Sequence, residues 1–214
     1  MKRIVVLASG YGSNLQVILD SCRDMLISGQ VVAVFSNKHE ATALNRARNF
    51  MIPTHVILES RYTNKDEFDH QLIHEINYYH PHLIVLAGYM RILSIEFIEY
   101  YSGQILNIHP SLLPRYPGLN THQKVIRNRD YEHGASVHFV TKHLDQGPVV
   151  LQSKIPVFSG DTIDSLTVRV KDQEHVIYPQ AINWFINDRL VMYNGRAWLD
   201  GKRLPKSGYP KIFL

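Results

Sequence analysis

The sequence predicts an α/β fold with a mostly parallel, doubly wound sheet that helices cover on both faces. Short apolar runs alternate with amphipathic helical segments through the first half of the 214-residue chain. The runs are apolar along their whole length, as strands are when helices cover both faces of a parallel sheet. After residue 109 the pattern changes, and further strands and one long helix are expected to extend the sheet.

The first half is expected to alternate strands with helices. The apolar runs of strand length are 4–8, 31–35, 54–58, 83–87 and 105–109. The helical segments, marked by apolar residues three and four apart, are 15–27, 41–50, 65–79 and 94–101. Ser13 and Gln16 stand three residues apart where the first helix begins, which predicts a capping box.

The second half begins with a loop, because residues 110–118 contain three prolines and a glycine. The elements expected after it are a short helix at 122–128, strands at 136–140 and 149–157, a long helix at 161–185 and a hairpin of 190–193 with 197–199. Asp161 or Thr162 is the expected N-cap of the long helix. Asn194-Gly195 predicts a type I′ turn in the hairpin.

Neither a linker nor a repeat interrupts the chain, so we expect one domain over 1–214, with a first half at 1–109 and a second half at 110–214. The single cysteine, Cys22, cannot form an internal disulfide, which fits a cytoplasmic protein. No apolar stretch approaches the roughly 18 residues of a membrane span. The mild, dispersed net charge of +4 suits a small anionic substrate better than nucleic acid. Monomer and weak homodimer both stay open.

The most informative segment is Asn107-Ile108-His109-Pro110 at the end of an expected buried strand. Residues two apart on a strand share a face, so the side chains of Asn107 and His109 project to the same side. An amide donor and an imidazole can stabilise an oxyanion and move a proton during acyl transfer. A carboxylate such as Asp145 could orient the imidazole and favour its protonated form.

Two further loops follow buried strands, at the edge where open α/β sheets bind ligands. Residues 9–15 open a helix and contain two glycines, so the free N–H groups of that helix could bind a phosphate. A capped turn without a ligand explains the same residues, because the third glycine of a dinucleotide motif and the lysine of a P-loop are missing. Residues 87–93 form either a ligand-binding loop or an ordinary connection.

The histidines do not predict a metal site. His70 and His74 stand four residues apart on a helix, but no glutamate lies beside His70 as in a zinc-protease helix. On sequence alone, Glu174 belongs to a solvated helix face.

Four segments together resemble the phosphoribosylglycinamide formyltransferase family, in its short single-domain form. The matching segments are Gly12-Ser13-Asn14-Leu15, 86–93, Asn107-Ile108-His109-Pro110-Ser111-Leu112-Leu113-Pro114 and 134–145. They recur in one order, and the resemblance runs from Lys2 to about Tyr209. It implies a single α/β domain whose N-terminal half, residues 1–109, is Rossmann-like.

The resemblance implies roles for individual positions. Asn107, His109 and Asp145 match the family's catalytic trio. Positions that match ribonucleotide contacts are Gly12, Ser13, Asn14, Lys171, Asp172, Gln173 and Glu174. Positions that match folate contacts are Lys65, Met90, Arg91, Ile92, Leu93, Asn107, Thr141, Lys142, His143 and Leu144. Family members often have arginine where this chain has Lys65, and lysine keeps the charge but loses the planar fork.

The resemblance implies transfer of a formyl group from 10-formyltetrahydrofolate, as co-substrate, to the glycine amine of 5′-phosphoribosylglycinamide in de novo purine synthesis, without a metal. Asn107 and His109 would stabilise the formyl oxygen. Asp145 is expected to raise the pKa of His109 above about 6.5. Residues 111–131 are expected to form a lid, and the Leu113–Pro114 peptide bond is expected to be cis.

Three alternatives use the same motifs. A formyltetrahydrofolate hydrolase normally carries an extra N-terminal domain, which we do not expect because the first strand begins near residue 3. A transfer-RNA formyltransferase would need a C-terminal RNA-binding domain. The third alternative is a non-catalytic folate- or nucleotide-binding protein, and the joint presence of Asn107, His109 and Asp145 disfavours it.

Overall fold

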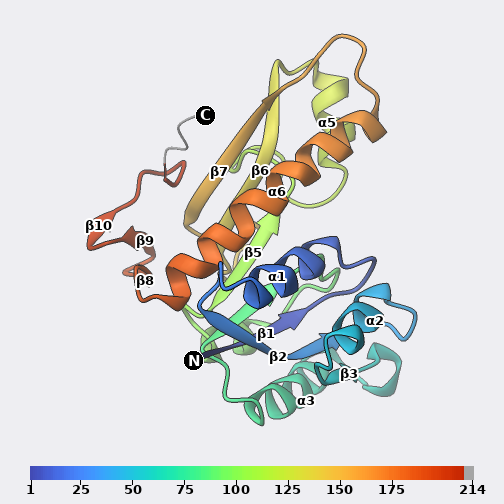
Figure 1. Ribbon diagram of the computed structural model, residues 1–214. Helices are drawn as coiled ribbons and strands as arrows, with labels where there is room; N and C mark the ends of the chain where they lie inside the picture. The colour runs from blue at the N-terminus through green and yellow to red at the C-terminus, as the bar shows by residue number, and fades with distance from the viewer. Residues whose placement is uncertain (210–214) are drawn as a thin grey trace.

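Apolar strands and the helices that connect them build one large sheet in the computed structural model, which describes residues 1–209 (Figure 1). The expected domain includes residues 210–214, which lie outside the described residues. The strands of the large sheet are β1 (Lys2–Leu7), β2 (Gly29–Ser36), β3 (Thr54–Val56), β4 (Leu83–Leu86), β5 (Ile105–His109), β6 (Glu132–Phe139) and β7 (Val149–Pro156). The helices are α1 (Ser13–Arg23), α2 (Thr42–Asn49), the 3₁₀ turn η1 (Glu59–Arg61), α3 (Lys65–Asn77), α4 (Ile95–Tyr100), α5 (Thr121–Asn128) and α6 (Ile163–Ile186).

The large sheet has seven strands in the order β3-β2-β1-β4-β5-β6-β7. Pairs from β3 to β5 are parallel, whereas β6 and β7 join antiparallel. The expected α/β class with a mostly parallel sheet is therefore confirmed. The strand order reverses between β1 and β4, and ligands of such sheets bind outside the carboxyl ends of the strands at this point.

Alternate residues of β1 point into two separate hydrophobic clusters, as the two-residue period of a strand requires. Ile4 and Val6 lie in a cluster with buried residues of α1, α2 and α6. Val5 and Leu7 lie in a second cluster with buried residues of α3 and α4. The helices therefore cover both faces of the sheet, which explains why the strands are apolar throughout.

Helix α6, orange in Figure 1, runs across the sheet and fixes the second half against the first. Its Tyr178 is fully buried, and the hydroxyl lies 3.0 Å from the carbonyl oxygens of both Leu86 and Leu106. The hydroxyl thus ties the helix to two adjacent strands, β4 and β5. The expected cap is confirmed at Thr162, which forms a capping box with Ser165.

Several expected boundaries move by a few residues, and one expected cap is wrong. The hydroxyl of Ser13 does not cap α1; the N-cap is Gly12, whose φ of 77° lies in the left-handed region. A Cβ at Gly12 would lie 2.7 Å from the Cβ of Ala43. Backbone conformation and the close packing of α2 therefore both require glycine here.

The C-terminal strands form a separate small sheet in the order β10-β9-β8. These strands are β8 (Leu190–Tyr193), β9 (Arg196–Leu199) and β10 (Lys202–Arg203). Asn194 and Gly195 both have positive φ, at 48° and 66°, as the predicted type I′ turn requires. Within residues 1–209, none of the helices combines the length and apolar character needed to cross a bilayer.

Replacing Gly134 with alanine should destabilise the fold, because the new Cβ would lie 1.9 Å from the carbonyl oxygen of Ser153 on the neighbouring strand. Relief of that overlap requires β6 and β7 to separate, and overpacking of this kind costs about 1–3 kcal/mol or more. Chemical denaturation measures the loss. Gly160→Ala is the control, because its new Cβ meets nothing within 4 Å. Equal stability of the two variants would contradict the assigned packing.

Candidate active site

The loops that follow β1 and β4 lie side by side at the carboxyl edge of the sheet. The hydroxyl of Ser9 donates to Asn37 Oδ1 over 2.6 Å and accepts the backbone N–H of Met90 over 2.8 Å. The N–H of Ser9 also donates to the carbonyl oxygen of Gly88 over 3.1 Å. The two loops expected to bind ligands are therefore hydrogen-bonded to each other.

Antiparallel pairing of β5 with β6 places four polar side chains opposite one another. Asn107 pairs with His138, and His109 pairs with Ser136. The intervening Ile108 and Val137 belong to the hydrophobic cluster on the opposite face of the sheet. The strand alternation predicted for Asn107 and His109 thus extends across the strand boundary to β6.

Asp145 stands in the turn after β6, where three groups surround its carboxylate. Oδ2 accepts the backbone N–H of Gly118 over 2.8 Å and lies 3.4 Å from Nδ1 of His109. Oδ1 lies 3.6 Å from Nε2 of His138. The backbone of Asp145 has a φ of 52°, a conformation uncommon for residues other than glycine. The structure therefore brings the sequence-predicted Asn107, His109 and Asp145 together.

The carboxylate of Asp145 is buried but keeps its charge. Burial raises the pKa of a carboxyl group, because the low dielectric disfavours the anion. The neighbouring His138, the N–H of Gly118 and the charge of His109 act in the opposite direction and lower the pKa of Asp145 to about 2. Asp145 is thus a preformed anion at neutral pH.

His109 does not have the raised pKa that the sequence predicts. Burial of the imidazole lowers the pKa of His109, and this exceeds the opposing effects of the Tyr116 carbonyl and the Asp145 carboxylate. Nε2 lies 2.8 Å from the carbonyl oxygen of Tyr116 and donates its hydrogen there. The direction of the pKa shift is therefore opposite to the predicted one.

The expected lid, residues 111–131, contacts both catalytic candidates through its backbone. The carbonyl of Tyr116 accepts from His109, and the N–H of Gly118 donates to Asp145. The Leu113–Pro114 peptide bond is cis, which confirms that prediction. Any movement of this segment would change the hydrogen bonding of His109 and Asp145 directly.

The residues expected to bind a ribonucleotide come from two distant parts of the chain. Asn14 Nδ2 on α1 donates to Glu174 Oε2 on α6 over 2.8 Å. Gln173 Oε1 accepts the hydroxyl hydrogen of Ser153 over 2.5 Å, whereas Asp172 is exposed. Glycine and serine at the start of α1 therefore lie close to the middle of α6.

Glu174 is buried and does not belong to a solvated helix face, so the interpretation from sequence alone is wrong. Burial raises the pKa of Glu174, while the hydrogen bond from Asn14 and the charge of Lys171 lower it. A carboxylate held in this way can accept hydrogen bonds from a hydroxyl-bearing ligand.

The residues expected to bind folate divide into buried and exposed groups. Lys65 Nζ donates to the carbonyl of Leu93 over 2.9 Å. The guanidinium of Arg91 packs on the ring of Phe68, 4.0 Å from its centroid, and donates to the carbonyl of Lys65 over 3.2 Å. The exposed residues of this set are Lys65, Met90, Ile92, Lys142, His143 and Leu144, and Arg91 and Thr141 are half-buried. The side chain of Arg91 is thus held in place by contacts within the protein.

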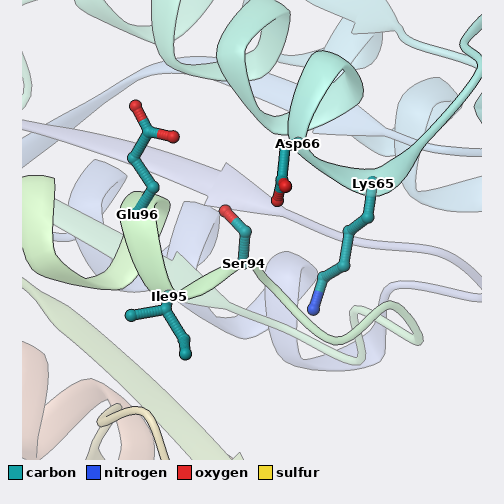
Figure 2. A pocket seen from close by; sticks show the side chains of 5 residues that line it. All are labelled: Lys65, Asp66, Ser94, Ile95 and Glu96. Carbon is teal, nitrogen blue, oxygen red and sulfur yellow. The ribbon is translucent and has the colours of Figure 1, made fainter.

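An open cavity of about 410 Å³ lies beside Lys65 and is lined by Lys65, Asp66, Ser94, Ile95 and Glu96. Figure 2 shows Lys65 and Asp66 on the first turn of α3, facing the start of α4. The three catalytic candidates do not line it. This cavity therefore lies beside the residues expected to bind folate and not beside the three catalytic candidates. Among residues 1–209, no cluster of three histidine, cysteine, aspartate or glutamate side chains could hold a metal.

Sequence analysis assigned no role to His138, Tyr116 or Gly118. The sequence does contain a pattern that could have indicated His138. Ser136 and His138 alternate with apolar residues along one strand, so their side chains share a face. The contacts of Tyr116 and Gly118 use backbone atoms, which a sequence pattern does not reveal.

This chain is similar to known proteins both in sequence and in structure. A family model described as formyl transferase matches residues 2–182. The chain is 57% identical over 206 residues to the phosphoribosylglycinamide formyltransferase of Escherichia coli, covering 96% of this chain and 97% of that one. It is similar to the solved phosphoribosylglycinamide formyltransferase of Coxiella burnetii, with a TM-score of 0.94, 44% identity and coverage of 97% and 98%.

The stability of the protein should fall as the pH falls from about 6.5 to about 4. His133 Nε2 lies 3.0 Å from His122 Nδ1, and burial first, then the charge of His122, lower the pKa of His133 to about 4. The unfolded chain binds this proton near pH 6.5, so unfolding takes up protons throughout the window and becomes easier.

Urea midpoints at about pH 7.5 and about pH 5 measure this effect, with His133→Gln as the comparison. Glutamine keeps hydrogen-bonding atoms but cannot gain a proton, so its midpoint should fall less between the two pH values. An equally steep fall in both proteins would contradict the role given to His133.

Proposed function

The chain belongs to the formyl transferase family, and from that premise we propose that it transfers a formyl group from 10-formyltetrahydrofolate to the glycine amine of 5′-phosphoribosylglycinamide. The products are formylglycinamide ribonucleotide and tetrahydrofolate, in de novo purine synthesis. The observation that carries the proposal is the meeting of the half-buried Asn107 with the buried His109 and Asp145 in one polar group. The full-length similarity to the enzyme of Escherichia coli supports it.

The reaction is an acyl transfer between two nitrogen atoms. The unprotonated glycine amine attacks the formyl carbon and forms the new C–N bond. The bond from the formyl carbon to N10 of the folate then breaks, and its electron pair stays on N10. The proton that the amine loses ends on N10, directly through His109 or through an ordered water. This route needs neither a covalent enzyme intermediate nor a metal.

Asn107 and His109 stabilise the negative charge that grows on the formyl oxygen. The amide nitrogen of Asn107 is one donor. His109 presents its Nε2–H to the Tyr116 carbonyl in the free enzyme, so a substrate oxygen must replace that carbonyl as the acceptor. Loss of one such donor elsewhere costs about 10²–10³ in turnover.

Asp145 stabilises any positive charge that His109 acquires during proton transfer. Its carboxylate lies 3.4 Å from Nδ1 of His109 and is already ionised at neutral pH. An imidazolium at this place would have two acceptors, the carboxylate at Nδ1 and the Tyr116 carbonyl or a substrate oxygen at Nε2. The preformed anion therefore assists the step without reorganisation.

The ribonucleotide phosphate binds at Gly12, Ser13 and Asn14, where the first N–H groups of α1 are free to donate. Glu174, with Gln173 and Lys171 nearby on α6, contacts the sugar and glycinamide portions. The folate binds along residues 90–93 and 141–144. The exposed Met90 and Ile92 supply apolar contact area, and the cavity beside Lys65 takes the acidic end of the folate.

The protein works in the cytoplasm on these small molecules, as a monomer or weak homodimer, without nucleic acid or membrane partners. The single cysteine and the dispersed charge support this setting.

The assay that tests the proposal follows absorbance during folate release from 10-formyltetrahydrofolate, with and without the ribonucleotide. Release that depends on the ribonucleotide supports the transferase. Release that proceeds equally without it indicates the hydrolase and overturns the proposal. Binding of both ligands without release indicates a silent binding protein and also overturns it.

Asp145→Asn should remove most of the activity while leaving the fold intact. The same exchange in a serine-protease triad lowers kcat about 10⁴-fold, and we expect a loss of at least about 10²-fold here. Asparagine tolerates the left-handed backbone at this position, so folding should survive. Steady-state turnover and circular dichroism measure both effects.

The control for Asp145→Asn is Asp164→Asn, which neutralises an exposed carboxylate in the first turn of α6. This control should keep wild-type turnover. Near-wild-type turnover of the Asp145 variant would refute the role assigned to Asp145.

Both substrates together should protect the lid from trypsin. Residues 111–131 expose Arg115, Lys124, Arg127 and Arg129, and closure over the ligands would restrict these sites. Mass spectrometry of timed digests measures cleavage there, and cleavage after the exposed Lys202 provides the reference. An unchanged ratio of lid to reference cleavage with both ligands would argue against closure.

A further inference from the structure

His138 is a buried titratable residue with no part in the proposed chemistry. Its side chain is 2% exposed and lies directly across the β5–β6 pair from Asn107. A buried imidazole retains hydrogen-bond partners for both ring nitrogens, because an unpaired polar atom in the interior is costly. The partners of these two nitrogens define what His138 can do.

The backbone determines which ring nitrogen of His138 carries the hydrogen. Nδ1 lies 2.9 Å from the carbonyl oxygen of Phe139, which can only accept. Nδ1 therefore carries the hydrogen, and Nε2 of the neutral ring has a free lone pair. That lone pair accepts a hydrogen from Asn107 Nδ2 over 3.1 Å.

This acceptor selects one of the two orientations of the Asn107 amide. Turning the amide by half a rotation would direct Oδ1 at Nε2, and two lone pairs would then face each other. The favoured orientation uses one hydrogen of Nδ2 and leaves the second hydrogen for a ligand. Asn107 therefore has its donor defined before a substrate arrives, which is the preorganisation an oxyanion site requires.

An irregularity in the sheet lies directly opposite His138, on β7. Val137 pairs with Leu151 of β7, but His138 pairs with Val149, so Val150 is left over in the register. Such a β-bulge bends the strand that contains it and is common beside active sites.

Two titratable groups also face His138, namely Asp145 at 3.6 Å and the ring of His109. The distance to Asp145 exceeds that of a hydrogen bond, and only a protonated ring has a hydrogen on Nε2 to direct at the carboxylate. Asn107 is therefore the group through which the neutral ring of His138 acts.

We propose that His138 is a positioning residue that holds the Asn107 amide with its nitrogen as the donor for the formyl oxygen. This role rests on the proposed transferase function. His138 itself does not touch the reacting atoms.

Two amide variants separate the contacts of the ring. Glutamine at position 138 places an acceptor oxygen near the position of Nε2, so His138→Gln keeps the contact to Asn107. Asparagine places its amide near the position of Nδ1, so His138→Asn keeps the contact to Phe139 and loses the one to Asn107. Each variant loses one of the two hydrogen bonds of the ring, so the two variants differ in which contact is lost and not in how many.

His138→Asn should lower kcat by about tenfold or more, part of the roughly 10²–10³-fold that loss of a whole oxyanion donor costs. Its KM for the ribonucleotide should change by less than about twofold, because the lost interaction is made only in the transition state. His138→Gln should recover most of the kcat. An equal loss in both variants overturns the proposal, because it indicates packing rather than orientation.

A double-mutant cycle tests whether His138 acts through Asn107. In the Asn107→Ala background, His138→Asn should change kcat by less than about twofold, since no amide remains to be oriented. The same factor in both backgrounds overturns the proposal. The wild-type protein in the same assay tests the function separately: without ribonucleotide-dependent release the transferase fails and the role of His138 with it, whereas with release the cycle decides on His138 alone.

Discussion

The buried charge of Asp145 is the constraint on which the rest of the site depends. A carboxylate removed from water is costly unless hydrogen-bond donors or positive charges compensate it. Here the N–H of Gly118 donates to Oδ2, and the titratable rings of His109 and His138 lie beside Oδ2 and Oδ1. These groups come from residues 111–131, from β5 and from β6, so burying the charge requires all three segments to be in place.

Much of this fold follows from pattern. Uninterrupted apolar strands predict a covered parallel sheet, and two-residue alternation places Asn107 and His109 on one face. The pattern does not reveal which residues of the neighbouring strand lie beside Asn107 and His109. The antiparallel return of β6 sets His138 opposite Asn107, and no local preference of the sequence determines that register.

The balance between burial and neighbouring charges around a titratable group cannot be predicted from the sequence either. A carboxylate beside His109 predicts a raised pKa, yet burial of the ring has the larger effect and lowers it. Glu174 is a second case. The sequence alone assigns it to a solvated helix face, but α1 packs against it and Asn14 donates a hydrogen bond to its carboxylate. Both outcomes depend on how much water the folded chain removes from a group, and that depends on elements far apart in the sequence.

The segment 111–131 contacts both titratable groups of the site. Its Tyr116 carbonyl accepts the hydrogen of His109, and its Gly118 N–H supports the charge of Asp145. His109 therefore lies between a carboxylate at Nδ1 and a carbonyl at Nε2, and both groups are acceptors. The site is thus arranged to stabilise a positive charge on His109.

The most direct test of this account is the protonation of the histidines in the free protein, measured by nitrogen-15 NMR over a pH titration, with His109→Asn and His138→Gln used for assignment. The account predicts that His109 titrates below its ordinary pKa of about 6.5 and that His138 carries its hydrogen on Nδ1 at about pH 7.5. An imidazolium at His109 under that condition, or a hydrogen on Nε2 of neutral His138, would contradict it.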